Sequence, residues 1–535
     1  MLQKNLWGIS MITLTCLYGL LAAVAIGICA ICGASVTVAI AVSLIVLLIQ
    51  FLIGPWITDL SMKFFYKVKF NQDIPEWLAA YTEEVCGKYG IRMPKLGLIN
   101  DGAPNAFTYG RFRNDARIVV TRGTLELLTE EQVKAVVAHE IGHIVHLDML
   151  VMTVAQVVPL VMYAIYESCI KAETRSGKSS SDSSKSDAGY AVAAIIAYVL
   201  YLISQLIILW LSRTREYYAD AFSVEETKNP EALAGALVTI GYGLATVEKS
   251  AAQSGHSAAS PTTLGISDAQ SGKAMAVCCV NDGESDPRQS IRNAMKWDMW
   301  NIWAKLYEIG STHPLISKRL LAISDRSEEF GQERYIAFDE QRPESYADDF
   351  AKECLICFLP WATLICALIA LLAMNNMTLF SAGLIATAIF SLLKYLYRHP
   401  KNHAETTVRE LLGEVKVSGV TAIPCAIEGE IIGRGNPGCV FNEDFVLKDS
   451  TGIVMLDYNQ PLFIINKIFA MFKSKEYFGK TTKVTGWYRR SPVPYIEVKS
   501  METDGVTKKC WTWQVGLVAR IVFLVISVIL LLICL

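Results

Sequence analysis

The residues whose types and spacing could do chemistry gather in one short stretch, TEEQVKAVVAHEIGHIVHLDML, which begins at Thr129. Thr129 followed by Gln132 is a capping-box pattern, so we expect a helix to begin here. His139 and His143 lie one turn apart on that helix, and their imidazoles can therefore converge on one ion. Together with Glu140 they form H-E-x-x-H, which predicts two zinc ligands and a general base for a metal-bound water.

A catalytic zinc ion takes three protein ligands and keeps one position open, so a third ligand is needed. His146 lies on the same helical face but about 10 Å along the axis from His139, which favours a histidine on the helix surface. Glu216, in SRTREYYADAFSVE, could coordinate the ion while Asp220, four residues later, accepts a hydrogen bond from a ligating histidine. The alternative is an amphipathic helix with an exposed Glu and Asp. Asp148 is expected to cap or solvate a membrane boundary.

The composition indicates a membrane protein. The chain has 535 residues, of which 52% are hydrophobic and 19% charged, and its mean hydropathy is +0.34. Average soluble domains are less apolar and more charged, which excludes an ordinary cytosolic protein and a disordered one. The 49 Lys and Arg against 51 Asp and Glu give a net charge of −2, so we expect no nucleic-acid partner. Fourteen cysteines are too sparse for a disulfide scaffold.

Several apolar runs are long enough to cross a bilayer, which takes about 20 residues. The runs lie at about 10–31, 35–57, 149–167, 190–212, 355–374, 377–397 and 515–535. The last contains Arg520, so a short span and an interfacial anchor are both open for it. The first has no small-residue cleavage site after it, and we expect an anchor there and not a removable signal peptide.

Flanking Lys and Arg residues predict the orientation. They place the polar domains on the cytoplasmic side of the cell membrane. The flanking residues that indicate this are Lys63, Lys67, Lys69, Arg213, Arg215, Lys394, Arg398 and Lys401. A Ser-rich loop that would then lie outside disagrees with this rule through four basic residues: Lys171, Arg175, Lys178 and Lys185. Two crossings separate His143 from Glu216, so both halves of the predicted zinc site fall on the same face of the bilayer.

The polar stretches between the runs divide the chain into predicted domains. We expect the following order: two spans at 1–57, a metallopeptidase domain at 58–350 interrupted by the spans at 149–167 and 190–212, two further spans at 351–397, a β domain at 398–510, and a C-terminal membrane anchor at 511–535. The fold class is a membrane α-helical protein of six or seven spans, with an α-rich, zincin-like metallopeptidase domain carrying a small sheet and a C-terminal OB-like β-barrel.

The β domain is predicted from period-two alternation in five segments: GEVKVSGVTA, EGEIIGRG, FVLKDSTGIVMLDY, TTKVTGWYRR and PYIEVKSM. Asp449 to Gly452 has the composition of a hairpin turn. Five strands in about 100 residues suit an OB-like barrel. Arg489 and Arg490 are interpreted as part of a solvated barrel face. We expect this domain to regulate the enzyme or to recruit substrates, with its partner unknown.

In the H-E-x-x-H helix and the segment around Glu216, the chain resembles the HtpX-type membrane metallopeptidases, which are gluzincin-type relatives of the CAAX prenyl proteases. The resemblance covers roughly residues 1–330 and rests on four motifs in order: PNAFTYG at 104–110, VVAHEIGHIVHLDML at 136–150, SRTREYYAD at 212–220 and THPLISKRL at 312–320. It implies zinc bound by His139, His143 and Glu216, with Glu140 as the base and Asp220 as the hydrogen-bond acceptor for a ligating histidine.

The same resemblance implies two further roles. His313, which precedes a proline, would lie near the oxyanion of the transition state. The strand edge at 104–108, with Asn105, Ala106 and Phe107, would bind an extended substrate by backbone pairing, the alternative being a plain hairpin.

These features lead to one expected function and two rivals. We expect a membrane zinc endopeptidase that acts at the cytoplasmic face on misfolded or damaged membrane proteins or unfolded polypeptides, with the lipid bilayer as a further partner. The first rival is an endopeptidase for prenylated C-termini, and the second is a membrane scaffold with a structural or silent metal site.

Overall fold

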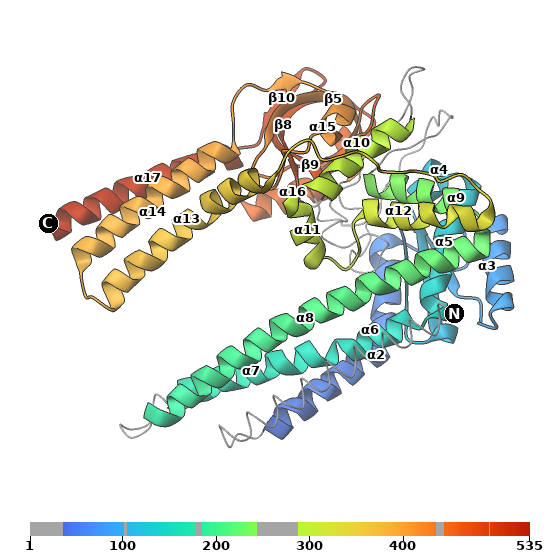
Figure 1. Ribbon diagram of the computed structural model, residues 1–535, viewed down its shortest axis with the longest axis horizontal. Coiled ribbons are helices and arrows are strands. Elements are labelled where there is room, and N and C mark those ends of the chain that lie inside the picture. Colours follow the sequence, from blue (N-terminus) through green and yellow to red (C-terminus); the bar gives the residue numbers. More distant parts are fainter. Residues whose placement is uncertain (1–35, 101–103, 177–183, 243–286, 435–442, 492) are drawn as a thin grey trace.

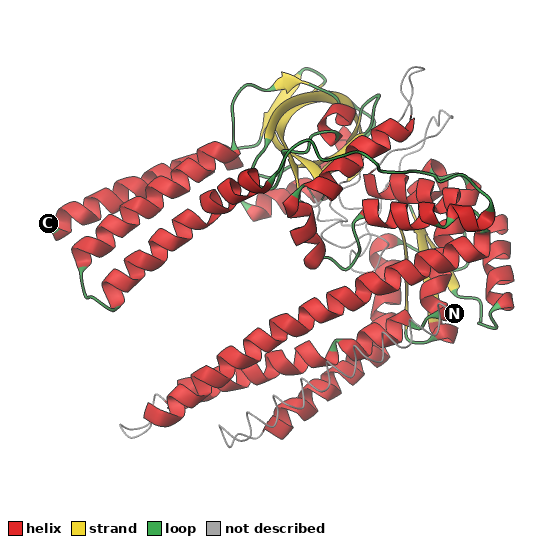
Figure 2. Ribbon diagram, viewed as in Figure 1, coloured by secondary structure: helices red, strands yellow, loops and turns green. Residues whose placement is uncertain are grey.

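The computed structural model describes residues 36–100, 104–176, 184–242, 287–434, 443–491 and 493–535. The first predicted span, at about 10–31, lies outside the described residues. Figure 1 shows a helical body with two long helical bundles that leave it on the same side, and a β-barrel at the root of one bundle. Figure 2 shows that helices dominate outside the barrel.

A three-stranded sheet and a group of helices form the helical body. The helices of the body are α3 (Glu76–Lys88), α4 (Arg122–Leu127), α5 (Glu130–Val145), α9 (Pro230–Leu237), α10 (Pro287–Trp300), α11 (Ile302–Ile309) and α12 (Ile316–Asp325), of which α4 and α5 pack on the sheet. In the sheet, β3 (Ala116–Thr121) is central, with β1 (Lys95–Ile99) parallel to it and β2 (Ala106–Gly110) antiparallel. Among the described strands, β2 therefore has a free edge.

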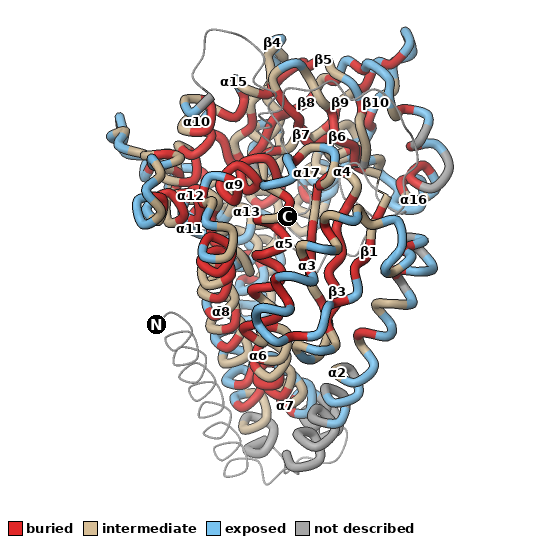
Figure 3. The backbone as a smooth tube through the Cα atoms, turned by 90° about the vertical axis from the view of Figure 1, so that its right-hand side faces the viewer, coloured by how far each residue is buried: buried red, intermediate tan, exposed pale blue. Residues whose placement is uncertain are grey.

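Helix α5 begins where the sequence predicts. Thr129 accepts a hydrogen bond from the backbone of Gln132, whose side chain in turn accepts one from the Thr129 backbone, so the capping box is complete. The helix is buried along most of its length, and Figure 3 shows this line of buried positions.

Gly142 lets α5 lie close against α8 (Ser184–Thr227). A Cβ atom at Gly142 would lie 3.2 Å from the Phe222 side chain and 3.3 Å from Cα of Ala219. Both distances are tighter than ordinary van der Waals contact, so a side chain at this position would push the two helices apart. The contact sets the separation between the two helices next to His143 and about one turn from His139.

Five described helices are long and apolar enough to cross a membrane: Asp148–Ile170, Gly189–Thr227, Ala347–Leu372, Met377–Arg398 and Thr512–Cys534. They coincide with five of the predicted runs, and α2 (Val36–Tyr66) includes the described part of the predicted run at 35–57. The helices α6 (Asp148–Ala155), α7 (Val157–Ser176) and α8 form one bundle with α2. The helices α13 (Ala347–Leu372), α14 (Met377–Arg398) and α17 (Thr512–Cys534) form the other.

The C-terminal β domain is a closed five-stranded barrel. Its strands are β5 (Ile423–Arg434), β6 (Phe445–Lys448), β7 (Ile453–Asp457), β8 (Thr481–Arg490) and β9 (Pro494–Thr503). They close in the order β5-β6-β7-β9-β8-β5, with only β7 and β9 parallel among these pairs. Short strands β4 (Ala404–Glu405) and β10 (Val506–Lys509) extend it, and α15 (Val408–Leu412) and α16 (Phe463–Phe472) flank it.

Two expectations for this domain are wrong. The segment 413–422 is not a strand, because Trp297 and Asn301 of the helical body donate hydrogen bonds to its carbonyls. Arg489 and Arg490 are buried and not solvated. Arg490 donates a hydrogen bond to Asp298 and lies over the Trp297 ring, so it joins the barrel to α10.

We predict that Gly142→Val disrupts the α5–α8 contact. Its branched side chain would overlap α8, which should cost about 1–3 kcal/mol of stability and move His139 and His143 away from Glu216. Thermal unfolding and the zinc content of the purified protein measure the two effects. Gly87→Val on α3 is the matched control, because a Cβ there meets nothing within 4 Å. A Gly142→Val protein with unchanged zinc and unfolding temperature would contradict the prediction.

Candidate metal centre

Helix α5 brings two histidines to one point. His139 and His143 project from the same face, and their Nε2 atoms lie 3.1 Å apart. His139 is fully buried, and the His143 side chain is 17% exposed. Two imidazole nitrogens this close to each other can bind the same metal ion.

Helix α8 supplies a carboxylate to the same point. Glu216 places Oε1 3.5 Å from Nε2 of His143 and Oε2 3.6 Å from Nε2 of His139. One ligand atom from each of these three residues lies within 4.8 Å of the others, and no other described group of His, Cys, Asp or Glu meets that criterion for a metal site. Two imidazoles and a carboxylate are a donor set that suits zinc, so these residues fit the ion that the sequence predicts.

A second carboxylate stands behind each histidine. Asp220 Oδ1 lies 3.0 Å from Nδ1 of His139, and Asp148 Oδ2 lies 2.6 Å from Nδ1 of His143. Each carboxylate favours a proton on Nδ1 and leaves Nε2 free to bind a metal. The expectation that Asp148 solvates a membrane boundary is wrong, because its buried carboxylate is shared between His143 and Arg215.

His313, just before α12, and Arg319, within α12, both contact the Glu216 carboxylate. His313 Nδ1 lies 3.0 Å from Oε2 of Glu216, and Arg319 lies 3.2 Å from the same oxygen. Arg319 also donates two hydrogen bonds to Asp220, at 2.6 and 2.8 Å. The sequence analysis did not assign a role to Arg319, although it lies in the THPLISKRL motif, because its pairing with Glu216 and Asp220 arises from packing between α12 and α8.

The histidines are held in a strongly acidic surrounding. Burial lowers the pKa of His139, but the neighbouring Asp220 and Glu216 outweigh this and raise it to about 9. The pKa of His143 is also raised, against the effect of burial, by Asp148 and Glu216. Below these pKa values a proton competes with a metal ion for the imidazoles, so metal affinity falls as the pH is lowered.

His146 is not the surface histidine that the sequence predicts. It is buried at the end of α5, and its ring lies edge-on against Phe222. Burial lowers its pKa to about 4, so it is neutral near pH 7. Phe222 also packs on Gly142, so His146 belongs to the apolar contact between α5 and α8 and not to the metal centre.

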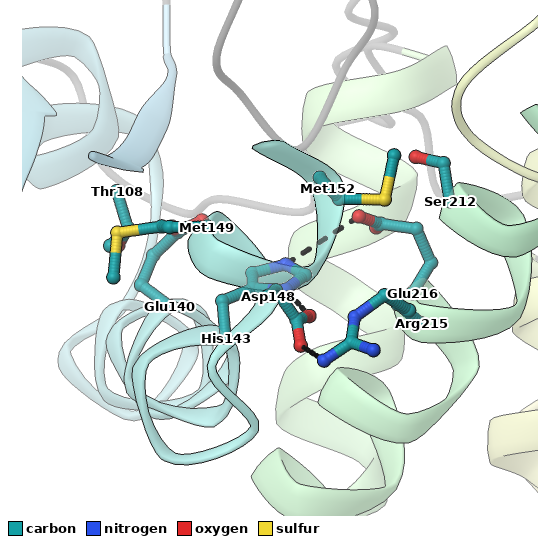
Figure 4. A pocket seen from close by; sticks show the side chains of 9 residues that line it. All are labelled: Thr108, Glu140, His143, Asp148, Met149, Met152, Ser212, Arg215 and Glu216. Carbon is teal, nitrogen blue, oxygen red and sulfur yellow. Dashed lines mark hydrogen bonds and ion pairs between the residues drawn. The ribbon is translucent and has the colours of Figure 1, made fainter. Parts of the chain in front are cut away.

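Glu140 lines a cavity together with His143 and Glu216 of the cluster. Figure 4 shows Glu140 and Glu216 on opposite sides of His143, with Met149 next to Glu140 and Met152 on the side of Glu216. The cavity is lined by Thr108, Glu140, His143, Asp148, Met149, Met152, Ser212, Arg215 and Glu216. The edge strand β2 therefore reaches the same space as the catalytic candidates.

The predicted substrate strand is placed beside the site, but with a different residue facing the cavity. Ala106 and Phe107 are buried and pair with β3. The backbone of Asn105 binds the side chains of Thr121 and Thr124. Of strand β2, Thr108 lines the cavity; period-two alternation could have identified it as the next position on the face of Ala106.

Comparison with known proteins agrees with this geometry. Residues 74–327 match the model for peptidase family M48. A protease HtpX homolog of Methanothermobacter thermautotrophicus is 37% identical over 210 residues, which cover 39% of this chain and 75% of the relative. Homologs from Aeropyrum pernix and Bordetella petrii are 30% and 32% identical. The matches cover 37% and 31% of this chain and span 60% and 56% of those relatives.

Among solved structures, the crystal structure of S. mikatae Ste24p is similar with a TM-score of 0.30 and 20% identity, covering 44% of this chain and 59% of that one. This likeness is too low to carry an argument. The family match, the apolar helices that are long enough to cross a membrane and the group of His139, His143 and Glu216 together indicate a membrane metallopeptidase. The chain belongs to peptidase family M48, among its HtpX-like members, which confirms the resemblance inferred from the four motifs.

We predict that Asp148→Asn weakens metal binding by about 10–100-fold, because the neutral amide no longer favours the Nδ1–H form of His143. Competition with a chromophoric chelator measures the affinity. Glu225→Gln, on the exposed face of α8, is the matched control and should bind metal like the wild type. Equal affinities for all three proteins would show that Asp148 does not orient the ligand.

Proposed function

We propose that this protein is a zinc-dependent endopeptidase of the cell membrane that degrades misfolded or damaged membrane proteins, with its active site at the cytoplasmic face. The observation that carries the proposal is the cluster of His139, His143 and Glu216, with Glu140 lining the same cavity. The family supports metalloprotease activity; the metal, the orientation and the substrates are our proposal.

The residues of the cluster can perform peptide hydrolysis. A zinc ion held by His139, His143 and Glu216 would lower the pKa of a bound water toward 7 and polarise the scissile carbonyl. Glu140 faces the cavity from the next position on α5, where it can take a proton from the attacking water and return it to the leaving amine. His313 is 3.0 Å from Glu216 and can donate to the negative charge that develops on the substrate oxygen.

Substrate binding is supported by the free edge of β2. An extended peptide that pairs with β2 would run past Thr108 and over the cluster. A second cavity shares Met149 and Met152 with the first and continues between α2, β2 and α6. It is lined by Phe51, Gly54, Pro55, Thr58, Tyr109, Gly110, Met149, Met152, Thr153 and Gln156. This mostly apolar path between the cluster and a predicted span suits segments of membrane proteins.

The orientation rests on the Lys and Arg flanks and on the arrangement of the two bundles. Both bundles leave the helical body in the same direction (Figure 1). One bilayer can therefore contain both bundles, with the body and the barrel together at one of its surfaces. The basic flanks of the spans assign that side to the cytoplasm.

We also propose that the barrel is OB-like and recruits substrates or regulates the peptidase. Its closure order, the parallel pair β7–β9 and the helix α16 between the third and fourth strands support this assignment. Arg490 and Trp297 couple it to the helical body, which gives a route to the peptidase.

We predict that Glu140→Gln retains zinc but lowers kcat for an unfolded membrane protein by at least about 100-fold, because the base is lost and the ligands remain. Glu131→Gln, at the exposed start of α5, is the control and should cleave normally. Gel-based cleavage and metal analysis of the same preparations measure both properties.

Full activity of Glu140→Gln would contradict the mechanism. A farnesylated peptide in the same assay tests the alternative substrate class: cleavage of that peptide, with the unfolded membrane protein left intact, would replace the proposed substrate by a prenylated C-terminus.

A further inference from the structure

Helix α16 presents an apolar face away from the barrel. Phe469 and Ala470 on its inner face are buried, and the Phe469 ring stacks on Tyr458 at 4.7 Å. The outward side chains are large, apolar and exposed: Leu462 62%, Phe463 70%, Ile464 70%, Ile465 47% and Ile468 53%. An exposed apolar patch of this kind is typical of a surface that contacts a membrane or another protein.

The position of α16 identifies the partner. Asn459 and Gln460, which precede α16, are hydrogen-bonded to the start of α17. Thr512 donates to the carbonyl of Asn459 at 2.6 Å, and the backbone of Trp511 donates to the Gln460 side chain at 3.2 Å. Gln460 also donates to the carbonyl of Lys509 at 3.0 Å. Helix α16 therefore starts at the level where α17 begins, at the barrel end of its bundle (Figure 1).

The flanking residues fit the boundary between lipid and water. Trp511, at the start of α17, is 53% exposed, and tryptophan is enriched at this depth of a bilayer. Lys467 places its ammonium group 4.9 Å from the Phe463 ring centroid and pairs with Glu443, so the charged groups lie along the edge of the apolar face and not within it. An apolar face with a charged edge is typical of a helix that lies in the membrane interface.

We propose that α16 is an interfacial helix whose outward face inserts into the bilayer beside α17 and holds the barrel against the membrane. The proposal rests on α17 being a membrane span and is independent of the metal centre. Because α16 and α17 both attach to the barrel, they fix it at two points, and Arg490 extends this constraint to the helical body.

The test uses the full chain in phosphatidylcholine vesicles, with an environment-sensitive fluorescent amino acid at position 464. The matched control places it at position 450, an exposed site at the β6–β7 turn, because this turn lies at the opposite end of β7 from Asn459. A third probe at position 523, within α17, reports on the span itself. Lipids brominated on their acyl chains serve as the quencher.

We expect quenching at position 464 at least about threefold stronger than at position 450, and strong quenching at position 523. A probe at position 468, one turn later on the same face, should behave like the one at 464. Quenching at 464 no stronger than at 450, with 523 quenched, would overturn the inference while leaving the span intact. A blue-shifted but unquenched probe at 464 would also overturn it, because a protein and not lipid would then cover α16.

Discussion

The contact between α5 and α8 at Gly142 is the constraint on which the metal centre depends. The two helices are far apart in sequence, and each carries only part of a ligand set. Phe222 and Ala219 fill the space that a side chain at position 142 would occupy, so the imidazoles and the Glu216 carboxylate meet. His146, packed on Phe222, extends this apolar contact by one turn.

The price of the arrangement is a concentration of buried charge. Glu216, Asp220 and Asp148 are all nearly excluded from solvent, which is costly for an ionised carboxylate unless it is paired. Arg319 pairs with the first two, and Arg215 with the third. The arginines therefore stabilise the carboxylates that orient the histidines, and a bound cation would add to the compensation.

The helices of the first bundle continue directly into the metal centre. Helix α8 is a single helix of 44 residues, so it would be about 66 Å long, which is more than twice the hydrocarbon core of a bilayer. The part beyond a span can therefore carry Glu216 and Asp220 to the body without a loop. On the N-terminal side of the bundle, helix α6 begins with Asp148, so the chain passes directly from the site into the bundle.

How much the sequence predicts depends on whether a feature is local. His139, Glu140 and His143 follow from spacing on one helix, and Glu216 with Asp220 follows from the same rule applied to a second helix. The partners Asp148, Arg215 and Arg319 could not be assigned in this way, because their roles arise from packing between elements. In the barrel, alternation predicts β8 and β9, whereas 413–422 has a strand-like pattern but binds Trp297 and Asn301 through its carbonyls.

X-ray absorption at the zinc K-edge tests the central claim most directly, because it reports the ligands of the bound ion. We expect nitrogen and oxygen donors only, with the scattering pattern of two imidazoles, and a loss of one oxygen donor or of the ion itself in Glu216→Ala. Three imidazoles, a sulfur donor, or a Glu216→Ala spectrum identical to that of the wild type would contradict a site shared between α5 and α8.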